Sequence, residues 1–255
     1  MLIRIILVLM ALAFAPAVLA ERITIAAASD LKGCLDEVAA NFRKAHAGDE
    51  VEVVYGSSGK FKTQIEQGAP FDLFFSADVA FPRDLLQANL AVGEVHPYGI
   101  GRIVLWSKTI DAKALSLADL TRTDIRKIAI ANPQHAPYGE RAEEALRASG
   151  VWENVEGKLV LGENIAQTAQ FAESGNAQVG IIALSLVLGP EMSGKGSYSL
   201  VPDSLHEPLE QGFVITKKAA DNTLAKAFAD YMGSGQTRAV MVRYGFALPG
   251  EASGH

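Results

Sequence analysis

The chain has 255 residues, of which 49% are hydrophobic and 20% are charged, a mixture typical of a globular protein with one large domain or two smaller lobes. Its 29 acidic residues outnumber its 23 basic ones, which argues against nucleic acid and anionic membranes as partners. This balance does not exclude a small anion, because dipoles aimed at a site act locally while distant charges are screened.

Residues 1–20 have the pattern of a secretory signal peptide. Arg4 gives a positive start, residues 5–14 are apolar, and Val18-Leu19-Ala20 places small residues at the cleavage positions. The apolar run is short for a membrane span, although an uncleaved anchor remains the alternative. We therefore predict export and cleavage after Ala20.

The first hundred residues predict strands and helices in alternation. In chain order these are a strand over 22–28, a helix from Leu31 to Phe42, a strand over 51–55, a short helix around Phe61 and Ile65, and a strand over 71–76. The last strand is almost wholly apolar, as expected for a parallel strand covered on both faces. Cys34 is the only cysteine, so no intramolecular disulfide can form, and we expect it to be buried in the first helix.

From Gly99 to Trp106 the pattern restarts, and we expect a strand there to cross into a second lobe. The elements predicted beyond it are a short helix or turn over 115–120, a strand over 127–131, a helix through Leu146, a strand over 158–161, a helix through Phe171, and strands over 179–182 and 198–201. Residues 210–215 are then predicted to cross back, before two amphipathic helices around 224–232 and 240–244.

This alternation predicts an α/β fold of two lobes, each a mainly parallel sheet flanked by helices, with a ligand cleft between them. The expected division is 1–20 signal peptide, 21–100 first part of lobe 1, 101–208 lobe 2, 209–250 return segment of lobe 1, and 251–255 polar tail.

Four predicted strand-to-helix junctions stand out: Ser29-Asp30, Ser57-Ser58, Pro137-Tyr138-Gly139 and Asn164-Ile165. The first amides of a helix lack partners within it, and the helix dipole favours negative charge there. Each junction alone is equally explained by a residue that caps its helix. Together they predict a cleft that binds an oxyanion through neutral donors, because no Lys or Arg occurs at any of them.

Several segments resemble periplasmic molybdate-binding proteins, the substrate receptors of molybdate ABC importers. They are Ala26-Ala27-Ala28-Ser29-Asp30-Leu31, Gly56-Ser57-Ser58-Gly59, Gln67-Gly68-Ala69-Pro70-Phe71-Asp72-Leu73-Phe74-Phe75-Ser76-Ala77-Asp78, the turn from Asn132-Pro133 to Tyr138-Gly139, and Arg243-Tyr244-Gly245-Phe246. They follow the family's order over essentially the whole chain after residue 20. The resemblance implies a two-lobed (type II) periplasmic binding fold with molybdate or tungstate in the cleft.

The resemblance also implies the contacts. Ser29 and Ser58 would bind oxyanion oxygens through hydroxyl and amide, and the amides of Tyr138 and Ile165 would complete the shell. These residues contact the oxygens and are not ligands of the metal atom. The implied partners are an inner-membrane permease and its ATPase. We expect a periplasmic monomer that needs no cofactor and is not an enzyme.

Two positions depart from the family pattern. Some members carry a ligand tyrosine where this chain has Ala183, so we expect the Tyr138 side chain to cover the ligand instead. Asp30 would place a carboxylate beside a dianion, which is repulsive. We therefore expect its amide to bind and its side chain to cap the first helix.

Other functions have less support in the sequence. The histidines His46, His96, His135, His206 and His255 lack metal-ligand spacing, and His135 is expected to be a solvated turn residue. A serine hydrolase would need Ser58 as nucleophile, but the turn lacks G-x-S-x-G spacing. A site for chromate, sulfate or phosphate stays open, whereas ferric iron would require clustered tyrosines and carboxylates.

Overall fold

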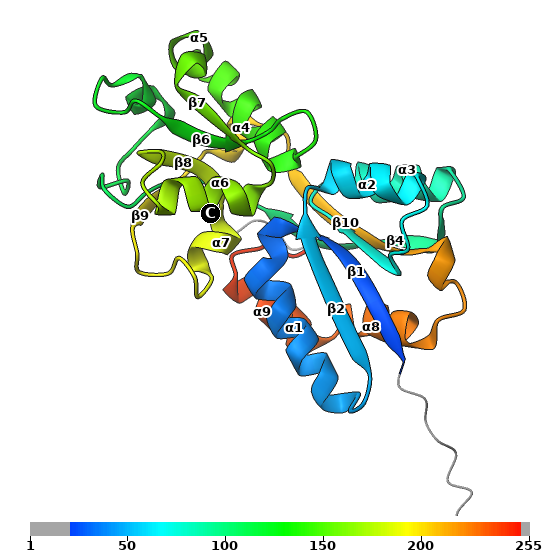
Figure 1. Cartoon of the computed structure of the whole chain (residues 1–255). Helices are drawn as coiled ribbons and strands as arrows, with labels where there is room; N and C mark the ends of the chain where they lie inside the picture. The colour runs from blue at the N-terminus through cyan, green and yellow to red at the C-terminus, as the bar shows by residue number, and fades with distance from the viewer. Residues whose placement is uncertain (1–20, 251–255) are drawn as a thin grey trace, which may run out of the picture.

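A computed structural model describes residues 21–250, so the predicted signal peptide (1–20) and polar tail (251–255) lie outside the described residues. Within this range the chain forms two five-stranded sheets, each flanked by helices, in two adjacent bodies (Figure 1). Between residues 21 and 250, no helix combines the length and apolar character needed to cross a bilayer. Cleavage after Ala20 stays a prediction.

The first sheet has the strand order β2-β1-β3-β10-β4. Its strands are β1 (Arg22–Ala28), β2 (Glu50–Gly56), β3 (Leu73–Ser76), β4 (Ala91–Gly101) and β10 (Leu209–Thr216). Its helices are α1 (Lys32–Ala45), α2 (Ser58–Glu66), α3 (Ala80–Gln87), α8 (Thr223–Met232) and α9 (Gly235–Arg243), with 3-10 turns at η1 (Ser29–Leu31) and η5 (Lys217–Ala219). Helices α1, α8 and α9 contribute to one apolar cluster and α2 to a separate one.

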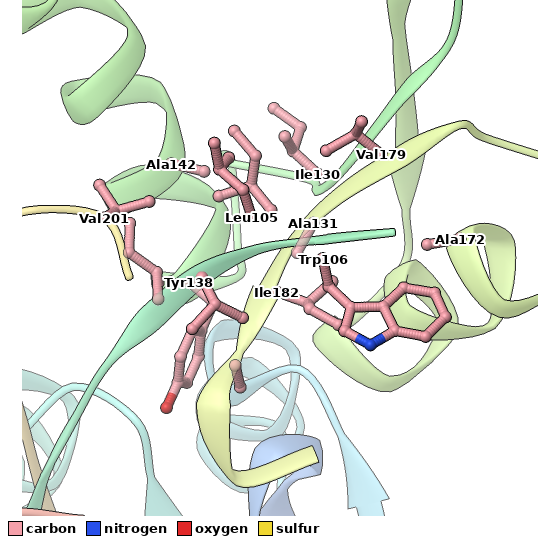
Figure 2. Close-up of a cluster of buried hydrophobic side chains, with 14 of the residues drawn as sticks. Leu105, Trp106, Ile130, Ala131, Tyr138, Ala142, Ala172, Val179, Ile182 and Val201 are labelled. Atoms are coloured by element: carbon pink, nitrogen blue, oxygen red, sulfur yellow. The ribbon is translucent and has the colours of Figure 1, made fainter. Parts of the chain in front are cut away.

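The second sheet has the order β7-β6-β8-β5-β9. Its strands are β5 (Ile103–Ser107), β6 (Ile128–Ala131), β7 (Leu159–Gly162), β8 (Val179–Ala183) and β9 (Ser197–Leu200). Its helices are α4 (Pro137–Ala148), α5 (Trp152–Val155), α6 (Ile165–Glu173) and α7 (Leu184–Leu188), with 3-10 turns at η2 (Leu117–Thr121), η3 (Glu156–Lys158) and η4 (Asp203–Leu205). Trp106, Ile130 and Ile182 lie in its core (Figure 2).

The chain passes between the two sheets twice. It leaves the first at the end of β4 and enters the second at Ile103, and it returns at Leu209. The sheets are less parallel than expected. Strands β1–β3 and β6–β8 pair in parallel, but β10 and β5, which arrive from the other sheet, run antiparallel to both of their neighbours.

The sequence pattern did not predict residues 91–98 of strand β4 or the helices α3, α5 and α7. The eleven residues of β4 include Gly93, Pro97 and Gly99, which interrupt the alternation by which a strand is recognised. Because β4 lies at the edge of its sheet, Pro97 is tolerated there.

Candidate functional site

The four strand-to-helix junctions meet at one small cavity between the two sheets. Its volume is about 10 Å³. The lining residues are Ala28, Ser29, Asp30, Gly56, Ser57, Ser58, Ala77, Ala136, Pro137, Tyr138 and Ile165. All five predicted site residues are therefore brought together, although their contact with a ligand stays a prediction.

Backbone amides of three helix starts are available at this cavity. Ser58, Tyr138 and Ile165 lie in the first turns of α2, α4 and α6, where an amide has no acceptor in its own helix. Within residues 21–250 no other acceptor binds these three amides. Neighbouring amides are already used, since the Gly59 amide donates to the carbonyl of His135 at 3.0 Å.

The two serine hydroxyls have different partners. Ser58 Oγ accepts from the amide of Ala77 at 3.0 Å, and its own proton has no acceptor among the described residues. Ser29 Oγ donates to Asn164 Oδ1 at 3.1 Å and accepts from the Ala166 amide at 3.2 Å, so it joins the two halves directly. Of the two, Ser58 is the one whose proton is free to meet an anion.

Capping explains only part of this pattern. Asn164 does cap α6, because its side chain accepts from the Gln167 amide. Ser57 is the N-cap of α2 by position, yet its side chain makes no cap bond. The expectation that Asp30 caps the first helix is also wrong: no side-chain cap bond is found at the start of η1 or α1.

The Asp30 side chain instead lies at the centre of a buried polar network. Its Oδ2 accepts from the hydroxyl of Tyr138 at 3.1 Å and from the side-chain amide of Gln211, Nε2, at 2.9 Å. Gln211 also accepts from the hydroxyl of Tyr98 at 2.8 Å. Burial raises the pKa of the Asp30 carboxyl to about 6, against the lowering effect of these hydrogen bonds.

The Tyr138 hydroxyl belongs to the same network, and the covering of the ligand by the Tyr138 side chain stays a prediction. Its side chain is buried at the edge of the second core, with the hydroxyl directed away from the other labelled side chains (Figure 2). The hydroxyl is committed to Asp30 and Gln211, and burial raises its pKa well above the usual value. At position 101 a Cβ would collide with both Tyr138 and Gln211, so this close approach requires a glycine.

A second set of contacts joins α2 to the second sheet. The Ser57 hydroxyl donates to the carbonyl of His135 and lies 3.0 Å from Nδ1 of the same residue. Lys60 on α2 forms an ion pair with Glu163, which follows β7, and His135 Nε2 lies 3.8 Å from that carboxylate. We call Ser57, Lys60, His135 and Glu163 the clasp.

The clasp corrects the expectation that His135 is a solvated turn residue, because its side chain is largely buried between the two halves. Burial and the nearby Lys60 lower its pKa. Ser57, His135 and Glu163 do not form a hydrolytic triad. The Ser57 hydroxyl has one proton, which it donates to the carbonyl of His135. His135 Nδ1 must therefore donate to the Ser57 oxygen, and it cannot act as a base toward Ser57.

Within residues 21–250 no group of three or more His, Cys, Asp or Glu side chains is placed to hold a metal ion. Cys34 is buried, as predicted, and burial raises its pKa.

Comparison with known proteins identifies the architecture. The family described as bacterial extracellular solute-binding protein matches residues 23–247. The chain belongs to this family. The molybdate-binding protein ModA of Rhodobacter capsulatus is 40% identical over 200 residues, which are 78% of each chain. ModA of Azotobacter vinelandii is 35% identical over 230 residues, 90% of this chain and 91% of that one.

A solved structure agrees. The periplasmic molybdate-binding protein of Azotobacter vinelandii superposes with a TM-score of 0.82 at 32% identity, covering 89% of this chain and 99% of that one. The resemblance to periplasmic molybdate-binding proteins and the two-lobed α/β fold are thus confirmed. We call the body built on the first sheet lobe 1 and the body built on the second sheet lobe 2.

Sequence reasoning missed Tyr98, Gln211 and the clasp. Gln211 lies in a strand recognised only as a crossing segment, and its partners Asp30 and Tyr138 are 181 and 73 residues away. The available signal was a polar residue, Gln211, shortly before the apolar residues Phe213-Val214-Ile215 of the same strand.

Proposed function

We propose that this chain captures molybdate between its lobes and delivers it to an ABC importer. The observation that carries the proposal is the donor set: hydroxyl and amide groups from both lobes surround one small cavity whose described lining contains no Lys or Arg. Neutral dipoles at helix starts suit a tetrahedral oxyanion. The molybdate-binding relatives, at 40% and 35% identity, support molybdate as that anion.

Further parts of the proposal rest on the same comparison. We propose that tungstate, which has the same charge and shape, is also bound, and that the partners are a permease with its ATPase. Residues 21–100 and 209–250 would form lobe 1 and residues 101–208 lobe 2. The protein would act as a periplasmic monomer, would need no cofactor and would catalyse no reaction.

The cavity must widen slightly to admit the anion. A volume of about 10 Å³ suits about one water molecule, which is smaller than an anion with four oxygens. The bond between Ser29 and Asn164 crosses the lobes at this point. We expect it to open on binding, which would free the Ser29 hydroxyl for the ligand.

The hydrogen-bond energies permit tight binding. Each charge-assisted hydrogen bond contributes roughly 1.5–3 kcal/mol, and association costs about 4–15 kcal/mol. Four to six such bonds can therefore support micromolar or tighter affinity. Sulfate has shorter bonds to oxygen than molybdate, so it would leave some donors stretched.

Calorimetric titration with molybdate, tungstate, chromate and sulfate tests the proposal. We expect molybdate and tungstate to bind with micromolar or lower dissociation constants and sulfate at least about tenfold more weakly. Equal affinity for sulfate and molybdate would contradict a molybdate site, and a preference for sulfate or chromate would favour the alternative oxyanion.

A further inference from the structure

Asp30, one of the residues at the cavity, has a buried carboxyl group with one unused oxygen. Asp30 is 1% exposed and is one of the residues that line the cavity, as are Ser29 and Ser58. Its Oδ2 accepts from Tyr138 and Gln211, whereas its Oδ1 is buried and has no hydrogen-bond partner among the described residues. A buried acceptor without a donor is costly, so this oxygen requires an explanation.

The groups around Asp30 do not supply a compensating positive charge. They are the hydroxyl of Tyr138 from α4, the amide of Gln211 from β10, and the backbone amides of Asp30 and Leu31. Tyr98 on β4 and Cys34 on α1 also lie close enough to be affected by an Asp30 charge. No Lys, Arg or His is among these groups, so burial dominates and favours the neutral carboxyl.

A dianion in this cavity would strengthen that preference. With Asp30 ionised, three negative charges would share one poorly solvated space. With Asp30 protonated, the repulsion disappears, and the O–H group at Oδ1 becomes a donor where the ionised form has only an acceptor.

We propose that Asp30 is a specificity-determining residue that binds the oxyanion in its neutral form and donates a hydrogen bond from Oδ1. This inference rests on the proposed function. Binding then combines the dianion with ionised Asp30 and one proton from solvent. At a pH above the pKa of Asp30 in the free protein, the protein therefore takes up one proton for each anion that it binds. The site would favour a fully deprotonated tetrahedral anion, because an anion that carries its own hydrogen brings a second donor to the same place.

The test measures protons directly. Molybdate is titrated calorimetrically into the wild-type protein at pH 8 in HEPES and in Tris, whose ionisation enthalpies differ. We expect uptake of about one proton per anion, and an affinity that falls about tenfold per pH unit between pH 6 and pH 8. Asp30→Asn keeps an acceptor for Tyr138 and Gln211 and places an amide donor at the other position. It should take up no proton, and its affinity should change less than about twofold over this range.

A matched control is Glu66→Gln, which removes an exposed carboxylate at the far end of α2. It should behave as the wild-type protein does. Molybdate binding by the wild-type protein without proton uptake would overturn the role of Asp30 and leave the proposed function standing. Much weaker binding by Asp30→Asn at pH 8 would also overturn it, since that result means the ionised carboxylate is needed. Absence of binding by both folded proteins would overturn the proposed function and this inference together.

Discussion

At the scale of single residues, Ser29 and Ser58 occupy equivalent junctions but differ in their hydrogen bonds. Ser29 donates its proton to Asn164 across the lobes. Ser58 accepts from the Ala77 amide, and its own proton has no acceptor within residues 21–250. We therefore expect Ser58 to contribute the more direct hydroxyl contact.

Ser58→Ala should weaken molybdate binding by about 1–3 kcal/mol, because a donor to a charged group is lost. It should also lower the free energy of unfolding by roughly 1–3 kcal/mol, since the buried Ala77 amide loses its acceptor. Thr63→Ala removes a hydroxyl that donates to the carbonyl of Gly59 within the same helix, and this variant serves as the control. Calorimetry and urea unfolding measure the two effects. Unchanged affinity in Ser58→Ala would exclude a contact between the Ser58 hydroxyl and the ligand.

The residues of the candidate site could be predicted where their signals are local in sequence, and not where their contacts join distant parts of the chain. Ser29, Ser58, Tyr138 and Ile165 were legible because each belongs to a strand-to-helix pattern within a few residues of sequence. The bonds of Asp30 to Tyr138 and Gln211 span 108 and 181 residues. No local periodicity encodes such contacts, so the network could not be read from the sequence.

At the scale of elements, the predicted strands and helices agree with the structure where apolar periodicity was continuous. The antiparallel pairing of β5 and β10 could not be predicted from the sequence, because it depends on the lobe from which each strand enters its sheet. The contacts of α2 with His135 and Glu163 in the other lobe could not be predicted either, so the clasp is known only from the structure.

The clasp should slow dissociation of the ligand modestly. Lys60 and Glu163 are about half exposed, at 47% and 49%, and an exposed ion pair contributes about 0–1 kcal/mol. Lys60→Ala or Glu163→Gln should therefore raise the dissociation rate of molybdate no more than about fivefold in stopped-flow experiments. Added salt should speed dissociation from the wild-type protein and have less effect on the double variant.

The pair Lys62 and Glu66 offers a control on the same helix, since both side chains belong to lobe 1. Removing that pair should leave the dissociation rate unchanged. If the double-mutant cycle on Lys60 and Glu163 gives no coupling, the clasp contributes nothing to closure.

At the scale of the whole molecule, the division of donors between the two lobes should couple ligand binding to closure of the lobes. Ser29 and Ser58 come from lobe 1, and Tyr138 and Ile165 come from lobe 2. Under the proposed function, the anion would need donors from both lobes. The ligand should therefore favour the closed arrangement by its additional contacts there. The chain crosses between the lobes at Arg102 and just before Leu209, and we expect the lobes to move relative to each other at these two crossings.

A crystal structure of the protein grown with molybdate, with anomalous diffraction measured at the molybdenum edge, tests the central claim most directly. We predict one strong anomalous peak in the cavity bounded by Ser29, Ser58, Tyr138 and Ile165. Its oxygens should lie about 2.7–3.1 Å from hydroxyl and amide donors of both lobes. A molybdenum peak elsewhere, or an anion held by donors of one lobe only, would contradict the account.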